Sequence, residues 1–166
     1  MDKLLRKLKI IMDSELAAYK ELLDLSIKKK DILIENKTAD LNDIVSEEQS
    51  LLSKVKQHEI SREDCIFSIS EECGYSDRSI DIETIIGLAE GSLKTEIISI
   101  RGKLKDVIKR LSDINENNKM LIDTHRKYIA FSMEAITGQM STLSTYSHAG
   151  LENNQETANM LIDSTI

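Results

Sequence analysis

The sequence contains no proline and no tryptophan, and only 4% of its 166 residues are aromatic. Strands are rich in Val, Tyr, Phe and Trp, and proline punctuates most mixed folds, so these absences favour an all-helical protein. No apolar run approaches the roughly 18 residues of a membrane-spanning helix, so we expect no direct membrane insertion. The start, "MDKLLRKLKII", lacks the apolar segment of a signal peptide, which predicts a cytoplasmic location.

Groups that carry chemistry are also scarce. His58, His125 and His148 lie far apart, and no two share the i, i+3 or i+4 spacing of a helical metal site. On one helix Cys65 and Cys73 would be about 12 Å apart, too far for a disulfide, which leaves buried thiols or a thiol switch. There is no phosphate-binding loop and no GxSxG motif. We therefore expect no enzyme, no catalytic residue, no metal and no cofactor.

The net charge of -7 argues against nucleic acid as a partner, because neutralising phosphates requires a basic face.

The residues that are present predict long amphipathic helices. Apolar side chains recur every three or four positions over residues 2–35 and again over residues 40–73. Residues 80–91 fit a short connector helix, and a third long helix is expected over residues 92–137, ended by Gly138.

The expected fold class is therefore all-α. We predict an antiparallel helical bundle or coiled coil of three long helices plus a short connector helix, with a flexible C-terminal tail. Residues 1–138 would form the bundle with a projecting long C-terminal helix, and residues 139–166 the tail. The third helix would be on the order of 70 Å long, so part of it should project or pair with another chain.

The second helix has a heptad seam with three charged members, Glu48, Glu59 and Arg62. Glu59 and Arg62 are three positions apart and can form an ion pair at the edge of the seam. The alternative is a structural polar layer that sets the register of the helices.

The third helix changes character near Asn115. Before it, three rows of the heptad are apolar. After it, one row becomes polar through Asn118, His125 and Ser132 while its neighbours remain apolar. Asn115 and Asn118 either form a polar layer within the bundle or mark where the core ends and a partner-binding strip begins.

The C-terminal part has the composition of a recognition segment. From Tyr128 onward there is no Lys or Arg, and large apolar residues stand among Ser, Thr, Asn and Gln. Methionine-bearing flexible segments suit adaptable recognition. We predict these partner-binding residues: Leu121, Ile122, Tyr128, Ile129, Phe131, Met133, Ile136, Met140 and Tyr146.

Two classes of protein fit these patterns. One is a binding module that shields an apolar helix of its partner, and the other is a structural or regulatory coiled-coil adaptor that only self-associates. The wide stripe before Asn115 favours a bundle over a two-stranded rope, and the C-terminal segment favours recognition.

Three segments, taken in order, resemble the FlgN family of flagellar export chaperones, in its Gram-positive form. They are "LAAYKELLDLSIKKKDILIENKTADLNDI", "EEQSLLSKVKQHEISRED" and "LSDINENNKMLID", the last carrying the family's Asn-x-x-Asn-x-x-Leu pattern. The resemblance covers nearly the whole chain.

The resemblance implies a cytoplasmic chaperone of the flagellar type III export system. Its partners would be the hook–filament junction proteins, bound through their C-terminal helical region, and the cytoplasmic domain of the export gate. The resemblance places client binding around residues 121–146, with Tyr128 and Tyr146 as aromatic candidates for contact with client or gate. Without a client, the exposed strip is expected to pair with itself in a homodimer.

Overall fold

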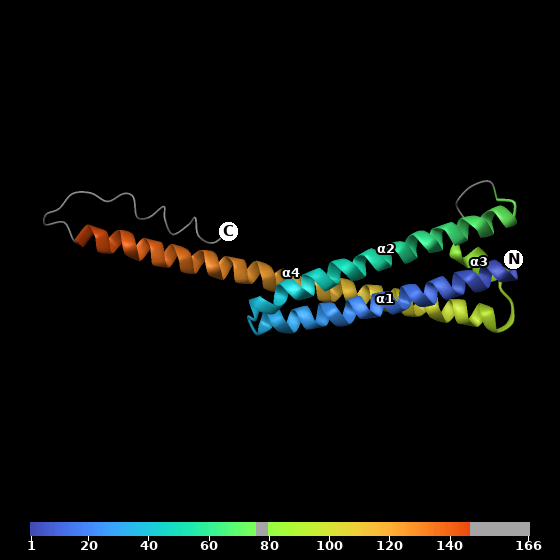
Figure 1. Ribbon diagram of the computed structural model, residues 1–166, viewed down its shortest axis with the longest axis horizontal. Helices are drawn as coiled ribbons and strands as arrows, with labels where there is room; N and C mark the ends of the chain where they lie inside the picture. The colour runs from blue at the N-terminus through green and yellow to red at the C-terminus, as the bar shows by residue number, and fades with distance from the viewer. Residues whose placement is uncertain (76–79, 147–166) are drawn as a thin grey trace. The chain divides into compact units, whose positions relative to one another are not determined.

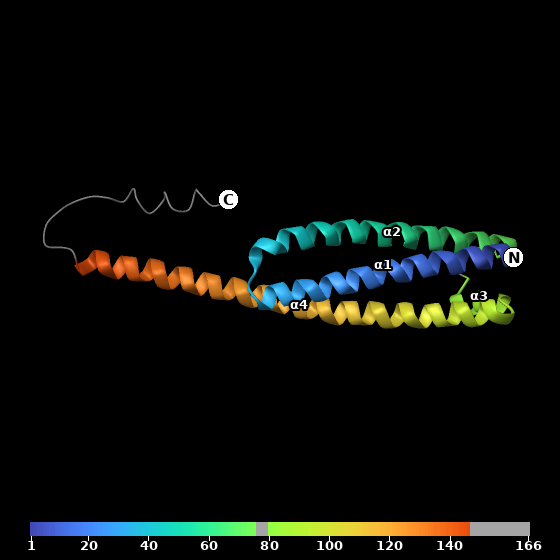
Figure 2. The same ribbon diagram turned by 60° about the horizontal axis from the view of Figure 1, so that its bottom comes forward.

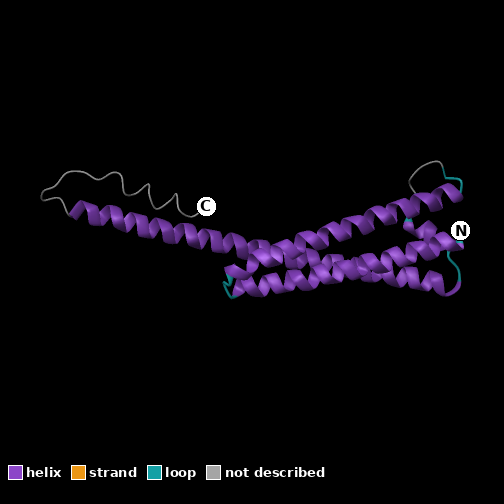
Figure 3. Cartoon of the chain, viewed as in Figure 1, coloured by secondary structure: helices purple, strands orange, loops and turns teal. Residues whose placement is uncertain are grey.

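The computed structural model describes the backbone of residues 1–75 and 80–146, and the side chains of these residues except for Thr38 and residues 138–146. The described part is almost entirely helical and contains no strand (Figure 3). The helices are α1 (Asp2–Ile34), the short 3-10 turn η1 (Thr38–Asp40), α2 (Leu41–Glu72), α3 (Ile82–Leu88) and α4 (Gly91–Tyr146), as labelled in Figure 1. The predicted all-α fold with three long helices and a short connector is confirmed.

One predicted boundary is wrong. Gly138 does not end the last helix, because α4 continues to Tyr146. A single glycine inside a helix costs only about 1 kcal/mol relative to alanine, which a long helix tolerates when no proline or capping motif follows. Of the predicted tail, residues 147–166 lie outside the described residues.

The first two helix ends are set by local sequence. After α1, Asn36 adopts a left-handed conformation (φ 55°), and the amides of Asn36 and Lys37 donate to the carbonyls of Leu33 and Ile32. After α2, Gly74 does the same (φ 76°). This arrangement satisfies carbonyl groups that a helix end would otherwise leave without donors. Asn36 and Gly74 stand directly after the ranges 2–35 and 40–73 that the sequence predicts for these two helices.

The chain divides into two compact units, Met1–Asp123 and Thr124–Ile166. The domain boundary expected after residue 138, between the bundle and the tail, stays a prediction.

Within the first unit, inter-helix contacts give the helix directions. Lys29 pairs with Glu48 and Glu15 pairs with Arg62, so α1 and α2 run antiparallel. Lys9 pairs with Glu96 while Ser26, further along α1, meets Asn118, so α4 runs parallel to α1 in this unit. The three long helices therefore run up, down and up, and in Figure 2 α1 lies between α2 and the first part of α4.

The hydrophobic core of the first unit is made from one face of each helix. α4 buries Leu93, Ile97, Ile100, Leu104, Val107 and Leu111, which follow the predicted heptad seam. α1 contributes most of the opposing surface, and the short α3 adds Ile85 and Ile86. Asp81 caps α3 by accepting a hydrogen bond from the amide of Thr84 at 2.7 Å. Hydrogen bonding from the Thr84 side chain, and then from this amide, lowers the pKa of the Asp81 carboxyl.

Candidate partner-binding surface

Polar side chains of α1 and α2 contact each other across the seam between the two helices. Lys29 Nζ lies 2.6 and 2.7 Å from the two carboxylate oxygens of Glu48. Tyr19 Oη donates to Glu59 at 2.8 Å. Arg62 Nε donates to Glu15 at 2.9 Å.

Glu59 and Arg62 therefore each bond to a side chain of α1, whereas an ion pair between them within α2 was only one of the two alternatives that the sequence left open. A side chain on the seam lies closer to the facing helix than to solvent, so the contact across the seam wins.

Two groups near the middle of the seam, Glu15 and Tyr19, have raised pKa values. Burial raises the pKa of Glu15, and the neighbouring Arg62 guanidinium opposes that rise. Burial, followed by the hydrogen bond to Glu59, raises the pKa of Tyr19 to about 12. At neutral pH the tyrosine is therefore a donor and Glu59 its acceptor, and the group has the chemistry of a structural contact.

Asn115 and Asn118 of α4 have different surroundings. Asn118 is buried, and its Nδ2 donates to the backbone carbonyl of Ser26 on α1 at 2.9 Å. Asn118 Oδ1 and Ser26 Oγ are buried and have no hydrogen-bond partner in the part of the chain that the structure describes. Asn115 is exposed and lies outside this buried contact. Of the two asparagines, Asn118 is therefore the one that contacts α1 in the interior of the bundle.

Sequence reasoning missed the α1 side of these contacts. Glu15, Ser26 and Lys29 do not stand out in the sequence, because an apolar stripe through Leu16 and Ile27 also fits this helix. A strict alternation of four and three positions gives Leu8, Met12, Glu15, Tyr19, Leu22, Ser26, Lys29 and Leu33. All of these lie buried or half-buried in the structure, so this stepping was the signal that could have found them.

In the second unit, large apolar side chains stand exposed. Five of them lie within nine residues of α4 and are each 57 to 70% exposed: Tyr128, Ile129, Phe131, Met133 and Ile136. Of the other predicted binding residues, Ile122 is exposed and Leu121 is half-buried, both in the first unit. The side chains of Met140 and Tyr146 lie outside those described. Exposed apolar clusters of this kind are typical of protein interaction sites.

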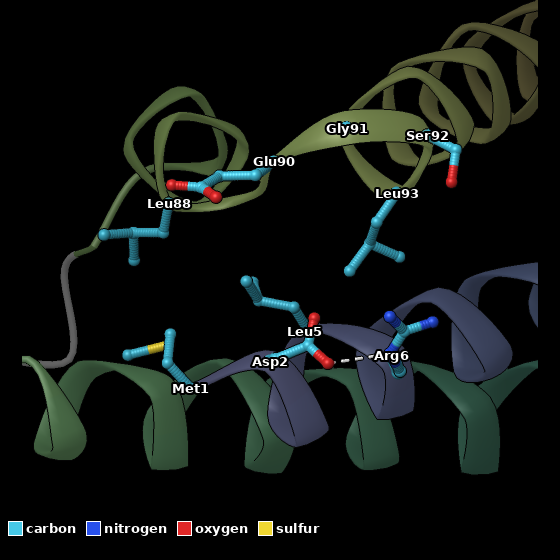
Figure 4. A pocket seen from close by; sticks show the side chains of 9 residues that line it. All are labelled: Met1, Asp2, Leu5, Arg6, Leu88, Glu90, Gly91, Ser92 and Leu93. Atoms are coloured by element: carbon cyan, nitrogen blue, oxygen red, sulfur yellow. Dashed lines mark hydrogen bonds and ion pairs between the residues drawn. The ribbon is translucent and has the colours of Figure 1, made fainter.

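A hollow of about 560 Å³ lies beside the start of α1 and the start of α4 (Figure 4). Its lining includes Leu5, Leu88 and Leu93 together with Glu90. Arg6 Nε donates to Asp2 at 2.8 Å, so the charged groups at the α1 side pair with each other. The lining residues include no histidine or cysteine, and their arrangement indicates no reaction.

Among the described residues, no group of His, Cys, Asp or Glu side chains is placed to hold a metal ion. None of the described helices is both long and apolar enough to cross a membrane.

A helical bundle whose seam residues hold its helices together, and whose second unit exposes apolar side chains, has the features of a partner-binding chaperone. The model of the family described as "FlgN protein" matches residues 1–154. The chain therefore belongs to the FlgN family, a family of flagellar export chaperones and not of enzymes.

A relative from Bacillus subtilis (strain 168), described as uncharacterized protein YvyG, is 30% identical over 118 residues. The match covers 71% of this chain and 71% of the relative. No solved structure matches the chain.

Proposed function

We propose that this flagellar export chaperone binds the C-terminal helical region of hook–filament junction proteins through a docking strip on α4. The strip comprises Leu121, Ile122, Tyr128, Ile129, Phe131, Met133 and Ile136. The observation that carries this proposal is the exposure of the five apolar side chains between Tyr128 and Ile136.

The apolar surface that α4 leaves in water favours packing against an apolar partner surface. Burying a large apolar side chain stabilises a complex by about 1.5–3 kcal/mol relative to leaving it exposed. Five such side chains supply a strong driving force for packing against an amphipathic helix, part of which is spent on ordering the partner. Covering the client's apolar face prevents premature assembly.

An export chaperone must also release its client. Polar residues of the strip's face, such as His125 and Ser132, interrupt its apolar rows. An interface of this mixed kind is weaker than a sealed core, which suits transfer to the cytoplasmic domain of the export gate. Tyr128 and Tyr146 are the aromatic candidates for contact with client or gate, and we place the protein in the cytoplasm. In the absence of client, the strip pairs with a second copy in a homodimer.

The test is calorimetry of the full chain with a C-terminal peptide from a hook–filament junction protein of the same organism. We expect Ile122→Asp and Ile129→Asp each to weaken binding at least tenfold, because each places a charge in the apolar contact. Ala130→Asp is the matched control, because Ala130 is exposed on another side of the same helix and the change adds the same charge.

Circular dichroism would show that the variants keep their helicity. Unchanged affinity in both isoleucine variants would exclude the strip. If the wild-type chain binds no client peptide and only self-associates, the alternative of a coiled-coil adaptor is correct.

A further inference from the structure

A second exposed row lies on α4 in the first unit, away from the docking strip. It consists of Lys94, Ile98, Arg101, Lys105, Ile108 and Lys109, all of which are exposed. We call these six residues the basic row.

The spacing of the basic row is that of a helix-packing seam. From Lys94 to Ile108 the steps are four, three, four and three, the repeat with which one helix presents a continuous edge to another. At 1.5 Å per residue the row is roughly 22 Å long. Ile98 and Ile108, 49% and 42% exposed, interrupt it with apolar side chains. The row is therefore amphipathic and suited to contact with a helix.

The charge of the row stands out in an acidic chain. Residues 91–112 contain six basic and two acidic side chains, whereas the whole chain has a net charge of -7. At 100° per residue, Glu96 lies about a third of a turn or more from every residue of the row, whereas Asp106 lies only about 60° from Lys109. Glu96 is engaged with Lys9 of α1 at 3.4 Å. The two carboxylates of this stretch are too few to neutralise the four cations of the row.

One contact within the first unit shows how a carboxylate reaches the row. Arg101 forms an ion pair with Glu83 of α3 and remains about half exposed. Lys94, Lys105 and Lys109 are exposed along the same row. Carboxylates repeated along a partner helix at the spacing of these cations would each reach one of them, as Glu83 reaches Arg101.

We infer that the basic row is a second docking surface, whose occupant is an acidic amphipathic helix of a partner protein. Charge complementarity carries this choice, because carboxylates flanking an apolar stripe match cations that flank Ile98 and Ile108. Nucleic acid is a poorer match, because the isoleucines offer nothing to phosphates and the rest of the chain is acidic. This surface acts independently of the docking strip proposed for the client.

The test uses the full chain and a labelled synthetic probe of about three heptads, with Leu or Ile at the a and d positions and Glu at e and g. Fluorescence anisotropy measures binding at low salt and again near 1 M salt, where the Debye length is only about 3 Å. A peptide with Lys in place of every Glu is the control probe. We expect the acidic probe to bind, high salt to weaken it, and the basic peptide not to bind.

Two double variants distinguish an effect of the basic row from a general effect of net charge. Lys94→Glu with Lys105→Glu should weaken binding of the acidic probe about tenfold or more. Lys103→Glu with Arg110→Glu changes the net charge equally on the same helix, but on the side away from the row, and should have a much smaller effect. All four side chains are exposed, so both variants should fold. Ala130→Asp, outside both the row and the docking strip, should leave probe binding unchanged.

Three results would overturn the inference. One is an equal loss in both charge-reversal variants, which would indicate general electrostatic attraction. Another is binding of a DNA or RNA duplex in place of the acidic probe. The third is self-association of the chain that the Lys94→Glu, Lys105→Glu variant abolishes, which would make the occupant a second copy.

Discussion

At the scale of single residues, Asn118 shows why a long helix accepts a poor helix former. Asparagine costs roughly 0.5–0.7 kcal/mol in a helix relative to alanine, and here one of its side-chain oxygens is also buried without a partner. In return Nδ2 makes a directed bond to the Ser26 carbonyl. A bond of this kind penalises helix registers in which the two residues do not face each other.

Replacing the donor tests this contact. We expect Asn118→Asp to lower the free energy of unfolding by about 3 kcal/mol at neutral pH, because it buries a carboxylate against a carbonyl oxygen. Asn115→Asp introduces the same charge three positions away at an exposed site and should change stability by no more than about 0.5 kcal/mol. Urea denaturation measures both, and equal effects would show that Asn118 has no special environment.

Tyr19 yields a prediction at alkaline pH. Its pKa is raised from 10.0 to about 12, so the folded state keeps a proton that the unfolded state loses. The stability that Tyr19 contributes is therefore complete below pH 10 and is lost as pH rises from 10 to about 12.

We expect the difference in ultraviolet titration between wild type and Tyr19→Phe to show one tyrosinate forming near pH 12. The stability difference between the two proteins should also shrink over this interval. Formation of that tyrosinate near pH 10 would contradict the buried bond to Glu59.

At the scale of elements, α1 and α2 are joined by apolar packing and by polar contacts along the seam. The Glu15–Arg62 contact is the most buried on its acidic side, with Glu15 only 3% exposed. A buried ion pair contributes little more to the free energy of unfolding than an apolar pair would. Removing one partner, however, leaves a buried unpaired charge and lowers stability strongly.

Removing Arg62 exposes that cost. We expect Arg62→Ala to destabilise the protein by about 2 kcal/mol at pH 7, because Glu15 remains buried as an uncompensated carboxylate. Without Arg62 the pKa of Glu15 should rise further, so the deficit should diminish as pH falls toward the unperturbed value of 4.5, where Glu15 becomes neutral.

The double variant Glu15→Met, Arg62→Met should regain most of the loss, within about 1 kcal/mol of wild type. Thermal denaturation at several pH values measures both. A deficit that does not change with pH would mean that lost packing, and not charge, is responsible.

At the scale of the whole molecule, the described hydrophobic core belongs to the first unit, while both units expose apolar side chains. Among the residues whose side chains are described, the buried hydrophobic core runs from Leu5 to Leu111, and the partly buried residues packed against it extend to Ile114, all within Met1–Asp123. The described apolar residues of the second unit are mostly exposed.

Ending the chain after Asp123 tests this division. We expect the truncated protein to unfold with a free energy within about 0.5 kcal/mol of the full chain, because no core residue is removed. It should no longer bind the client peptide, because most of the proposed strip is lost. A large loss of stability would show that residues beyond Asp123 take part in the core.

The helices, most of their ends and the α4 seam follow from the sequence. Periodicity over ten or more residues reports which face of a helix is buried, and Asn36 and Gly74 terminate helices through their own backbone preferences. Gly138 shows where such preferences fail. Glycine is favoured at a helix end but does not force one, and α4 continues to Tyr146. The apolar strip of the second unit was also predicted, since it depends only on helical spacing, while its role in binding stays a prediction.

The pairing of polar side chains could be decided only by the tertiary structure. Glu59 and Arg62 are near neighbours in sequence, yet Tyr19 and Glu15 of α1 are their partners, forty and forty-seven positions away. Asn115 and Asn118 have equal helix propensities, yet only Asn118 faces Ser26. Sequence periodicity determined which face each helix presents, whereas the register between helices, set by the packing of all faces together, decided which residues meet.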